Sequence, residues 1–321
     1  MSAGAEQAEA RAAATGQAPR RLARRVRPFP AAAGSSADPW VFTGSGRPGL
    51  WRRLRMLRRL VLVLLWTLLC MPVQLVLLGL PGRAKAALPR WYWSGVRRLI
   101  GIRVRCIGSL ARPRPGRPVV YVCNHSSWID IAVLGGILEG RFIAKAEVGT
   151  WPLINAVAWL GRTVFVSRQR ATTAQERDAM QAVLAAGDGL VLFPEGTTSD
   201  GSRVLPFRTP FFAVATTQPP PMIQPVSIVY DRLGGLPLGR GNRPVFAWYG
   251  DMDIASHFAR LGQLSGMRVS VVLHEPFDAA LFPDRKALSQ AVWQTVAAGA
   301  DQLRQNRPAR PLAVAVPATA A

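Results

Sequence analysis

The residues best suited to chemistry in this sequence are a histidine and an aspartate five positions apart. They lie in the segment NHSSWID (124–130), directly after the apolar run 119–123. Five residues turn about 140° around a helix, so the two side chains meet only if His125 precedes the helix that contains Asp130. Asp130 would then hold one ring nitrogen of His125 and leave the other nitrogen free as a general base.

The same segment is also compatible with a purely structural role. Ser127 and Asp130 have the spacing of a helix-capping box, in which case His125 is an ordinary loop residue. A metal site has little support, because the only other histidines, His257 and His274, lack ligand-like spacing. We therefore expect no metal ligands and no bound cofactor.

Two further segments place polar residues after apolar strands. FPEGTTSDG (193–201) follows the run 189–193, and its backbone N–H groups and hydroxyls could hold an anionic or hydroxylated ligand beside Glu195. GRTVFVSR (161–168) ends in Arg168, a side chain suited to bidentate phosphate contact. Each segment taken alone is equally compatible with a polar loop or a solvated surface arginine.

Taken together, these segments resemble the glycerolipid acyltransferase family, whose members include lysophosphatidate acyltransferases. The similarity covers about residues 118–230, and QPVSI (224–228) resembles the family's fourth motif, a hydrophobic strand near the acyl group. The resemblance implies two catalytic and four acceptor-binding residues: His125 and Asp130 for catalysis, Arg168 for the acceptor phosphate, and Glu195, Gly196 and Thr197 for further acceptor contacts.

One departure from the family pattern concerns the acceptor. Many phosphatidate-forming relatives carry an arginine after Phe-Pro-Glu-Gly-Thr, whereas this chain has Thr198. The longer string FPEGTTSDGSRVLPF (193–207) resembles the branch that includes acyltransferases of lyso-ornithine lipid, an acceptor without a phosphate.

The resemblance predicts transfer of a fatty acyl group to the hydroxyl of a lysolipid by general-base catalysis. The acyl donor would be acyl-CoA or an acyl carrier protein (acyl-ACP). The first expectation for the acceptor is 1-acyl-sn-glycerol-3-phosphate, giving phosphatidate, and the alternative is lyso-ornithine lipid. Two rivals from other classes are a lipid hydrolase that uses the same dyad and a non-enzymatic basic membrane-binding protein.

Charge and hydropathy indicate a membrane partner. The chain has 321 residues with 40 Lys and Arg against 18 Asp and Glu, a net charge of +22, which favours an anionic partner. No nucleic-acid-binding motif accompanies this charge. WRRLRMLRR (51–59) precedes the uncharged run 60–80, where Pro72 and Gln74 favour a kinked or re-entrant segment dipping into one leaflet. We expect a cell (inner) membrane location, with the active site facing the cytoplasm.

The domain organisation follows from these changes in composition. We expect a disordered basic tail (1–50), membrane-anchoring helices (51–100), an acyltransferase domain (101–305) and a flexible tail (306–321). The fold class is α/β, a mixed central sheet flanked by helices and preceded by the membrane-associated segment. Strands are expected at 104–107, 119–123, 163–166, 190–193, 225–229, 244–249 and 268–273. Helices are expected at 129–137, 153–160, 174–186 and 285–305.

Overall fold

The computed structural model describes residues 49–113, 117–145, 152–166, 173–216 and 219–317, all within one unit of the chain, Asp38–Ala321. The expected basic tail, apart from its last two residues, lies outside the described residues. So does Arg168, the residue expected to bind the acceptor phosphate.

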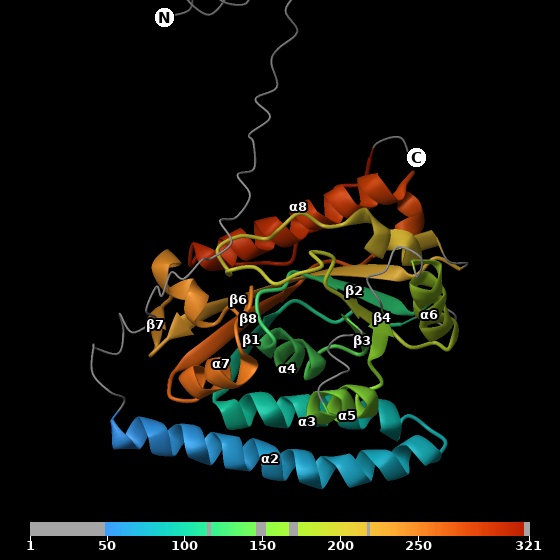
Figure 1. Cartoon of the computed structure of the whole chain (residues 1–321). Helices are drawn as coiled ribbons and strands as arrows, with labels where there is room; N and C mark the ends of the chain where they lie inside the picture. The colour runs from blue at the N-terminus through green and yellow to red at the C-terminus, as the bar shows by residue number, and fades with distance from the viewer. Residues whose placement is uncertain (1–48, 114–116, 146–151, 167–172, 217–218, 318–321) are drawn as a thin grey trace, which may run out of the picture. The chain divides into compact units, whose positions relative to one another are not determined.

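A mixed sheet forms the centre of this unit (Figure 1). Its main path runs β1-β8-β6-β2-β5-β3-β4, with β7 and β9 also paired to β6. Only the β6–β8 pair on that path is antiparallel. The strands are β1 (Ile102–Ile107), β2 (Val119–Cys123), β3 (Arg141–Lys145), β4 (Val164–Val166), β5 (Leu190–Leu192), β6 (Met222–Leu233), β7 (Leu236–Pro237), β8 (Met267–Leu273) and β9 (Phe277–Asp278). The expected mixed α/β sheet is therefore confirmed.

Helices cover both faces of the sheet, which explains why the central strands β2 and β5 are fully buried and contain no charged residue (Figure 1). Side chains alternate along β2: Tyr121 and Cys123 enter the core beneath α4, whereas Val120 and Val122 enter the core beneath α8. The helices are α2 (Leu50–Gly79), α3 (Ala84–Ile100), α4 (Ile129–Gly135), α5 (Pro152–Leu160), α6 (Thr173–Ala185), α7 (Ile254–Leu261) and α8 (Arg285–Arg304), with 3₁₀ helices η4 (Thr209–Thr216), η5 (Arg240–Val245) and η6 (Ala279–Leu281).

Most expected elements are found within a few residues of their bounds, but some differ. The expected strand 244–249 is wrong, because its start is the 3₁₀ helix η5. Pro244 cannot donate to a sheet ladder, and β6 already has β2 and β8 as neighbours. Strands β3, β7 and β9 and helix α7 were not predicted, since each is short and the apolar run of β3 between its charged ends is only three residues long. In the expected flexible tail, Leu312 donates its N–H to His274 and accepts the N–H of Glu275, so this part lies against the end of β8.

The apolar segment is one continuous 30-residue helix, α2, with Pro72 inside it. By length and composition it is the single helix among the described residues that could cross a membrane. It is followed by α3 and packs along it (Figure 1). Gln74 is buried, and its amide nitrogen donates to the carbonyls of Lys85 (2.9 Å) and Leu160 (2.8 Å). The polar residue that suggested a break in the helix therefore joins α2 to its neighbours.

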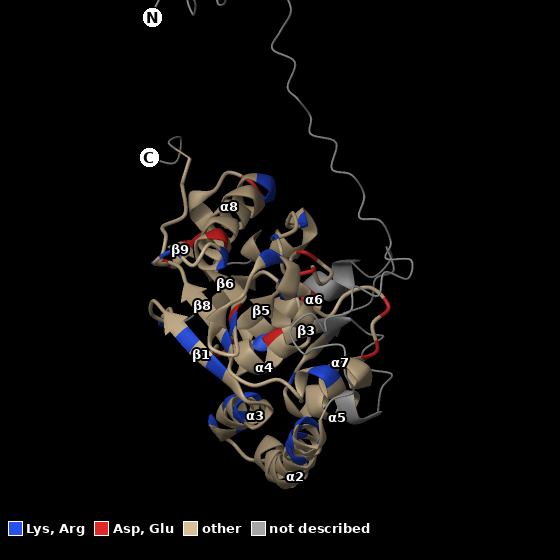
Figure 2. Cartoon of the chain, turned by 90° about the vertical axis from the view of Figure 1, so that its left-hand side faces the viewer, with Lys and Arg blue, Asp and Glu red and all other residues tan. Residues whose placement is uncertain are grey.

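Many of the Lys and Arg positions lie on α2, α3 and β1 (Figure 2). Two arginines of the basic segment 51–59 have partners in the protein. Arg59 is only 7% exposed, and its Nη1 donates to the carbonyls of Gly262 (2.9 Å) and Leu264 (2.7 Å). Arg55 donates to the carbonyl of Gln263 (3.0 Å). These bonds hold the first half of α2 against the turn that follows α7.

Replacing Arg59 with glutamine should lower the free energy of unfolding by about 2–3 kcal/mol, since two carbonyls lose a charged donor. Arg58→Gln is the matched control, because Arg58 is the exposed neighbour on the same helix and should change stability by less than about 0.5 kcal/mol. Urea unfolding in a neutral detergent, followed by tryptophan fluorescence, measures both. Equal losses in the two variants would contradict the structural role of Arg59.

Candidate active site

His125 and Asp130 come together at the carboxyl end of β2. His125 lies in the loop before α4, and its Nδ1 is 2.9 Å from Oδ2 of Asp130. The Asp130 side chain is fully buried, while that of His125 is 17% exposed. As the spacing requires, the two side chains meet because the histidine precedes the helix.

The surroundings of Asp130 fix which nitrogen of His125 carries the proton. Oδ2 of Asp130 also accepts the backbone N–H groups of Ser126 (2.7 Å) and Ser127 (2.9 Å). A carboxylate oxygen can only accept hydrogen bonds. Because this oxygen also faces Nδ1 of His125, Nδ1 must donate and is the protonated nitrogen. No described residue bonds Nε2, which keeps a lone pair directed toward the accessible side of the ring. This is the arrangement of a general base held by a carboxylate.

The start of α4 shows part of the capping box that the spacing of Ser127 and Asp130 indicates. Asp130 accepts the N–H groups of Ser126 and Ser127, and the Ser127 hydroxyl lies 3.4 Å from the N–H of Ile129. The N-cap residue itself is Trp128, which makes no side-chain cap bond. The carboxylate of Asp130 therefore caps the N-terminal end of α4 and also holds the His125 ring. The structural role and the catalytic role belong to the same aspartate.

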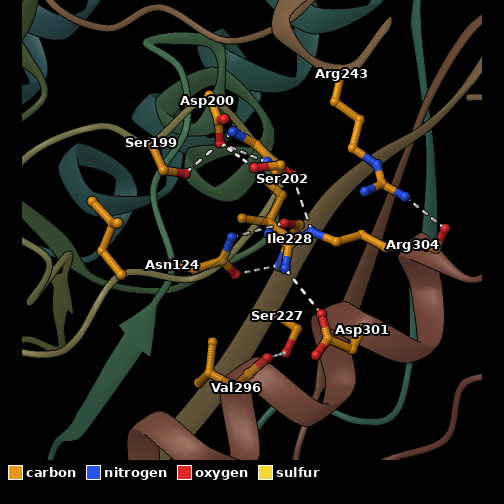
Figure 3. Close-up of polar contacts among 12 residues, drawn as sticks. Asn124, Ser199, Asp200, Ser202, Ser227, Ile228, Arg243, Val296, Asp301 and Arg304 are labelled. Carbon is orange, nitrogen blue, oxygen red and sulfur yellow. Dashed lines mark hydrogen bonds and ion pairs between the residues drawn. The ribbon is translucent and has the colours of Figure 1, made fainter. Parts of the chain in front are cut away.

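Sequence reasoning missed two residues that bind this loop to β6. Tyr230 donates its hydroxyl to Oδ1 of Asp130 (2.6 Å), and its ring stacks on Phe246 with centroids 4.9 Å apart. Burial and the nearby carboxylate of Asp130 raise the pKa of Tyr230 well above its usual value, so it remains a donor. Asn124 bonds both backbone groups of Ile228, at 2.9 and 2.8 Å (Figure 3). Tyr230 lies just beyond the fourth motif, where nothing in the sequence pairs it with Asp130.

Glu195 faces the histidine loop instead of solvent. It is 2% exposed, and its two oxygens accept the backbone N–H groups of His125 (2.7 Å) and Leu205 (2.9 Å). Burial is the main cause that raises the pKa of Glu195 to about 8. Glu195 therefore positions the main chain of His125, and its expected contact with the acceptor stays a prediction.

The rest of the turn is also tied to His125. The N–H of Ser199 donates to the carbonyl of His125 (3.0 Å), and the ring of Phe193 stacks on the imidazole with centroids 4.0 Å apart. Gly196 has a left-handed φ of +67°, and Thr197 beside it is exposed. The structure therefore places Gly196 and Thr197 beside the dyad, and their acceptor-binding role stays a prediction.

Two arginines hold the far end of this turn. Nε of Arg304 on α8 donates to the carbonyl of Gly201 (3.0 Å), and its Nη1 lies 3.3 Å from Asp301. Arg243 in η5 donates to the carbonyl of Arg304 (2.8 Å) (Figure 3). These cations support the loop, because their donors are engaged with groups of the protein.

The other two histidines lie apart from the dyad. His257 is buried and accepts the indole N–H of Trp128 (3.0 Å). His274 is buried against Ser227, with 2.8 Å between Nε2 and the hydroxyl, and Ser227 in turn donates to the carbonyl of Val296 (2.7 Å). Because this serine is buried and already donates, the pair is not an activated nucleophile. The described residues contain no group of three or more His, Cys, Asp and Glu side chains that could hold a metal.

Comparison with known proteins places these residues in a family context. The acyltransferase family model matches residues 103–229. The chain is 39% identical to the lyso-ornithine lipid O-acyltransferase of Brucella abortus, over 71% of this chain and 86% of that protein. It is 36% identical to the enzyme of the same name in Rhizobium meliloti, over 74% and 82%. It is also 29% identical to the 1-acyl-sn-glycerol-3-phosphate acyltransferase of Neisseria gonorrhoeae, over 59% and 72%.

Glu195→Gln should lower the free energy of unfolding by about 1–3 kcal/mol. The amide NH₂ of glutamine must face one of two backbone donors, so the bond to His125 or to Leu205 is lost. Glu275→Gln is the matched control at an exposed carboxylate. Thermal and urea unfolding measure both variants, and a Glu195→Gln variant as stable as the control would contradict the positioning role.

His274 should make the protein less stable in mild acid. Burial lowers its pKa from 6.5 to about 4. Between these pH values the histidine is protonated in the unfolded chain but neutral in the folded protein. The free energy of unfolding therefore falls as the pH drops from about 6.5 to 4, by up to about 3 kcal/mol. The non-titrating variant His274→Asn should be less stable at neutral pH but lose less on acidification. Urea midpoints measured at several pH values test this, and parallel profiles would rule it out.

Proposed function

Since this chain belongs to the acyltransferase family, and is an O-acyltransferase of lysolipids, we propose that His125 and Asp130 carry the transfer by general-base catalysis. The observation that supports the proposal most directly is the 2.9 Å contact between Nδ1 of His125 and the fully buried carboxylate of Asp130. It leaves Nε2 as the basic atom on the accessible side of the ring.

The proposed reaction is direct transfer to the acceptor without an acyl-enzyme. Nε2 of His125 removes the proton of the acceptor hydroxyl while the oxygen attacks the thioester carbonyl. Asp130 keeps the Nδ1–H tautomer and stabilises the imidazolium that forms. The C–S bond then breaks, and the imidazolium returns its proton to the departing thiolate. The new ester and the free thiol of the carrier are the products.

For the acceptor we place lyso-ornithine lipid first and lysophosphatidate second. The two relatives with 39% and 36% identity are named for the ornithine acceptor, whereas the glycerol-phosphate relative is 29% identical. Thr198 supports this order, because it removes the arginine that many phosphatidate-forming relatives carry there. On the sequence motifs alone lysophosphatidate came first, and those motifs keep it as the second candidate.

The acyl donor and the cellular location are inferred from the charge of the protein and from its apolar helix. Acyl-CoA and acyl-ACP are both acidic thioester carriers that suit a strongly basic protein. Helix α2 and the bacterial lipid acyltransferase relatives indicate membrane association. We propose attachment to the inner membrane with the dyad facing the cytoplasm, because the lysolipid stays in the bilayer while the carrier arrives from water.

His125→Ala should lower kcat for acyl transfer by about 10²–10⁴-fold, the usual contribution of a general base. Asp130→Asn should also lose activity, because a neutral amide does not stabilise the imidazolium and puts an NH₂ group where all four neighbours donate. Asp251→Asn at an exposed site is the matched control and should keep wild-type activity. The purified variants are assayed with a labelled acyl thioester and with lyso-ornithine lipid or lysophosphatidate as acceptor.

The same assay separates the acceptors and the hydrolase rival. Product from lyso-ornithine lipid alone supports the first acceptor, and product from lysophosphatidate would move the second acceptor ahead. Free fatty acid released at the full rate without any acceptor would favour a hydrolase. An active His125→Ala variant would remove the dyad from the mechanism.

A further inference from the structure

A solvent-exposed arginine, Arg208, lies on the outer side of the turn that holds His125. We infer that Arg208 binds the anionic group of the acceptor's head group, an inference that rests on the proposed acyl transfer. Arg208 is outside the segment whose acceptor role the family resemblance implies. It stands at the end of the loop that starts with Phe193.

Contacts with the turn fix the position of Arg208. Its backbone N–H donates to the carbonyl of Pro194 (2.9 Å), which joins the two ends of the loop. Its side chain then runs over Gly196: a Cβ added to this glycine would lie 3.2 Å from Nε and 3.4 Å from Cζ of Arg208. The guanidinium therefore lies directly above a residue that has no side chain.

The same turn is fastened to the catalytic histidine. Glu195 accepts the N–H of His125, and Ser199 donates to its carbonyl, so the residues between them lie next to the dyad. An acceptor whose hydroxyl reaches Nε2 can extend its head group over Gly196 and Thr197. Arg208 is the cation that such a head group would meet.

Arg208 differs from the neighbouring arginines because its guanidinium is available to bind a ligand. Arg243 and Arg304 donate to backbone carbonyls and support the loop. Arg203 also has an interaction of its own. Within the described ranges, the guanidinium of Arg208 has no hydrogen-bond or ion-pair partner, and the side chain is exposed. An unpaired guanidinium beside a reaction site is suited to bind an oxyanion through two parallel N–H bonds.

This position also compensates for Thr198. A phosphate or a carboxylate offers the same pair of oxygens, so Arg208 can serve the phosphate of lysophosphatidate or the carboxylate of an ornithine head group. With threonine at 198, the loop still presents one cation to the acceptor, from ten positions further along the chain. This positive charge belongs to Arg208, which lies above Gly196, and not to a residue at position 198 of the turn.

The test compares Arg208→Gln with Arg208→Lys and with the control Arg285→Gln, which removes an exposed arginine from the first turn of α8. Initial rates are measured in neutral detergent micelles at varied acceptor mole fraction, separately for lyso-ornithine lipid and lysophosphatidate, and at varied acyl thioester. Arg208→Gln should raise the acceptor KM by about tenfold or more, the effect of losing a charged hydrogen bond. Its kcat at saturating acceptor and its donor KM should stay within about twofold of wild type.

Further comparisons make the expected pattern specific. Arg208→Lys should recover most of the acceptor KM, because the charge is restored, and Arg285→Gln should match wild type. A KM effect with one acceptor only identifies whether phosphate or carboxylate is bound. Added salt should raise the acceptor KM of wild type more than that of Arg208→Gln.

Other results would overturn the inference. With an active wild type, it fails if Arg208→Gln keeps the wild-type KM for both acceptors, if Arg285→Gln raises KM equally, or if only kcat falls. Those outcomes leave the proposed acyl transfer intact. A wild-type protein that acylates neither acceptor would overturn the proposed function itself and this inference with it. Thermal unfolding of each variant verifies that the proteins compared are folded.

Discussion

The buried carboxylate of Asp130 is the interaction on which the site depends. A fully buried carboxylate is costly unless donors surround it, and here four groups donate to its two oxygens. They are the ring of His125, the amides of Ser126 and Ser127, and the hydroxyl of Tyr230. These donors come from the loop after β2 and from β6. One side chain thus fixes the start of α4, the tautomer of the histidine and the pairing of two strands at the point where chemistry occurs.

A second buried carboxyl group, that of Glu195, holds the opposite side of the same loop. Glu195 accepts the amides of His125 and Leu205, so the main chain of the histidine lies between an aspartate that fixes its ring and a glutamate that fixes its backbone. Phe193 stacks on the imidazole and limits its rotation. The acidic residues of both motifs therefore bind groups of the protein, and we expect the acceptor at the exposed part of the turn.

The sequence was informative where the signal is local. Apolar runs predicted β2 and β8 almost to the residue, and the spacing of His125 and Asp130 implied their meeting, because each depends on periodicity within a few residues. Contacts between distant parts of the chain left no such signal. Tyr230 lies 100 positions from Asp130, and Arg59 lies 203 positions from Gly262, so neither partner could be inferred. The bonds of Glu195 to the main chain of His125 and Leu205 could not be inferred either, because a motif shows which residues matter but not the direction of a side chain.

The connection between the apolar helix and the dyad explains why those distant contacts matter. In the proposed function the lysolipid stays in the bilayer, so the position of the histidine relative to the apolar helix decides whether it reaches the acceptor hydroxyl. Trp66 and Gln74 of α2 donate to carbonyls of α3, and Ser94 of α3 donates to the carbonyl of Gly136 at the end of α4. The first turn of α4 contains Asp130, which holds His125. These hydrogen bonds and the backbone of α4 therefore join the apolar helix to the loop of the general base, so in the proposed membrane attachment α2 and α3 determine where His125 lies relative to the lipid.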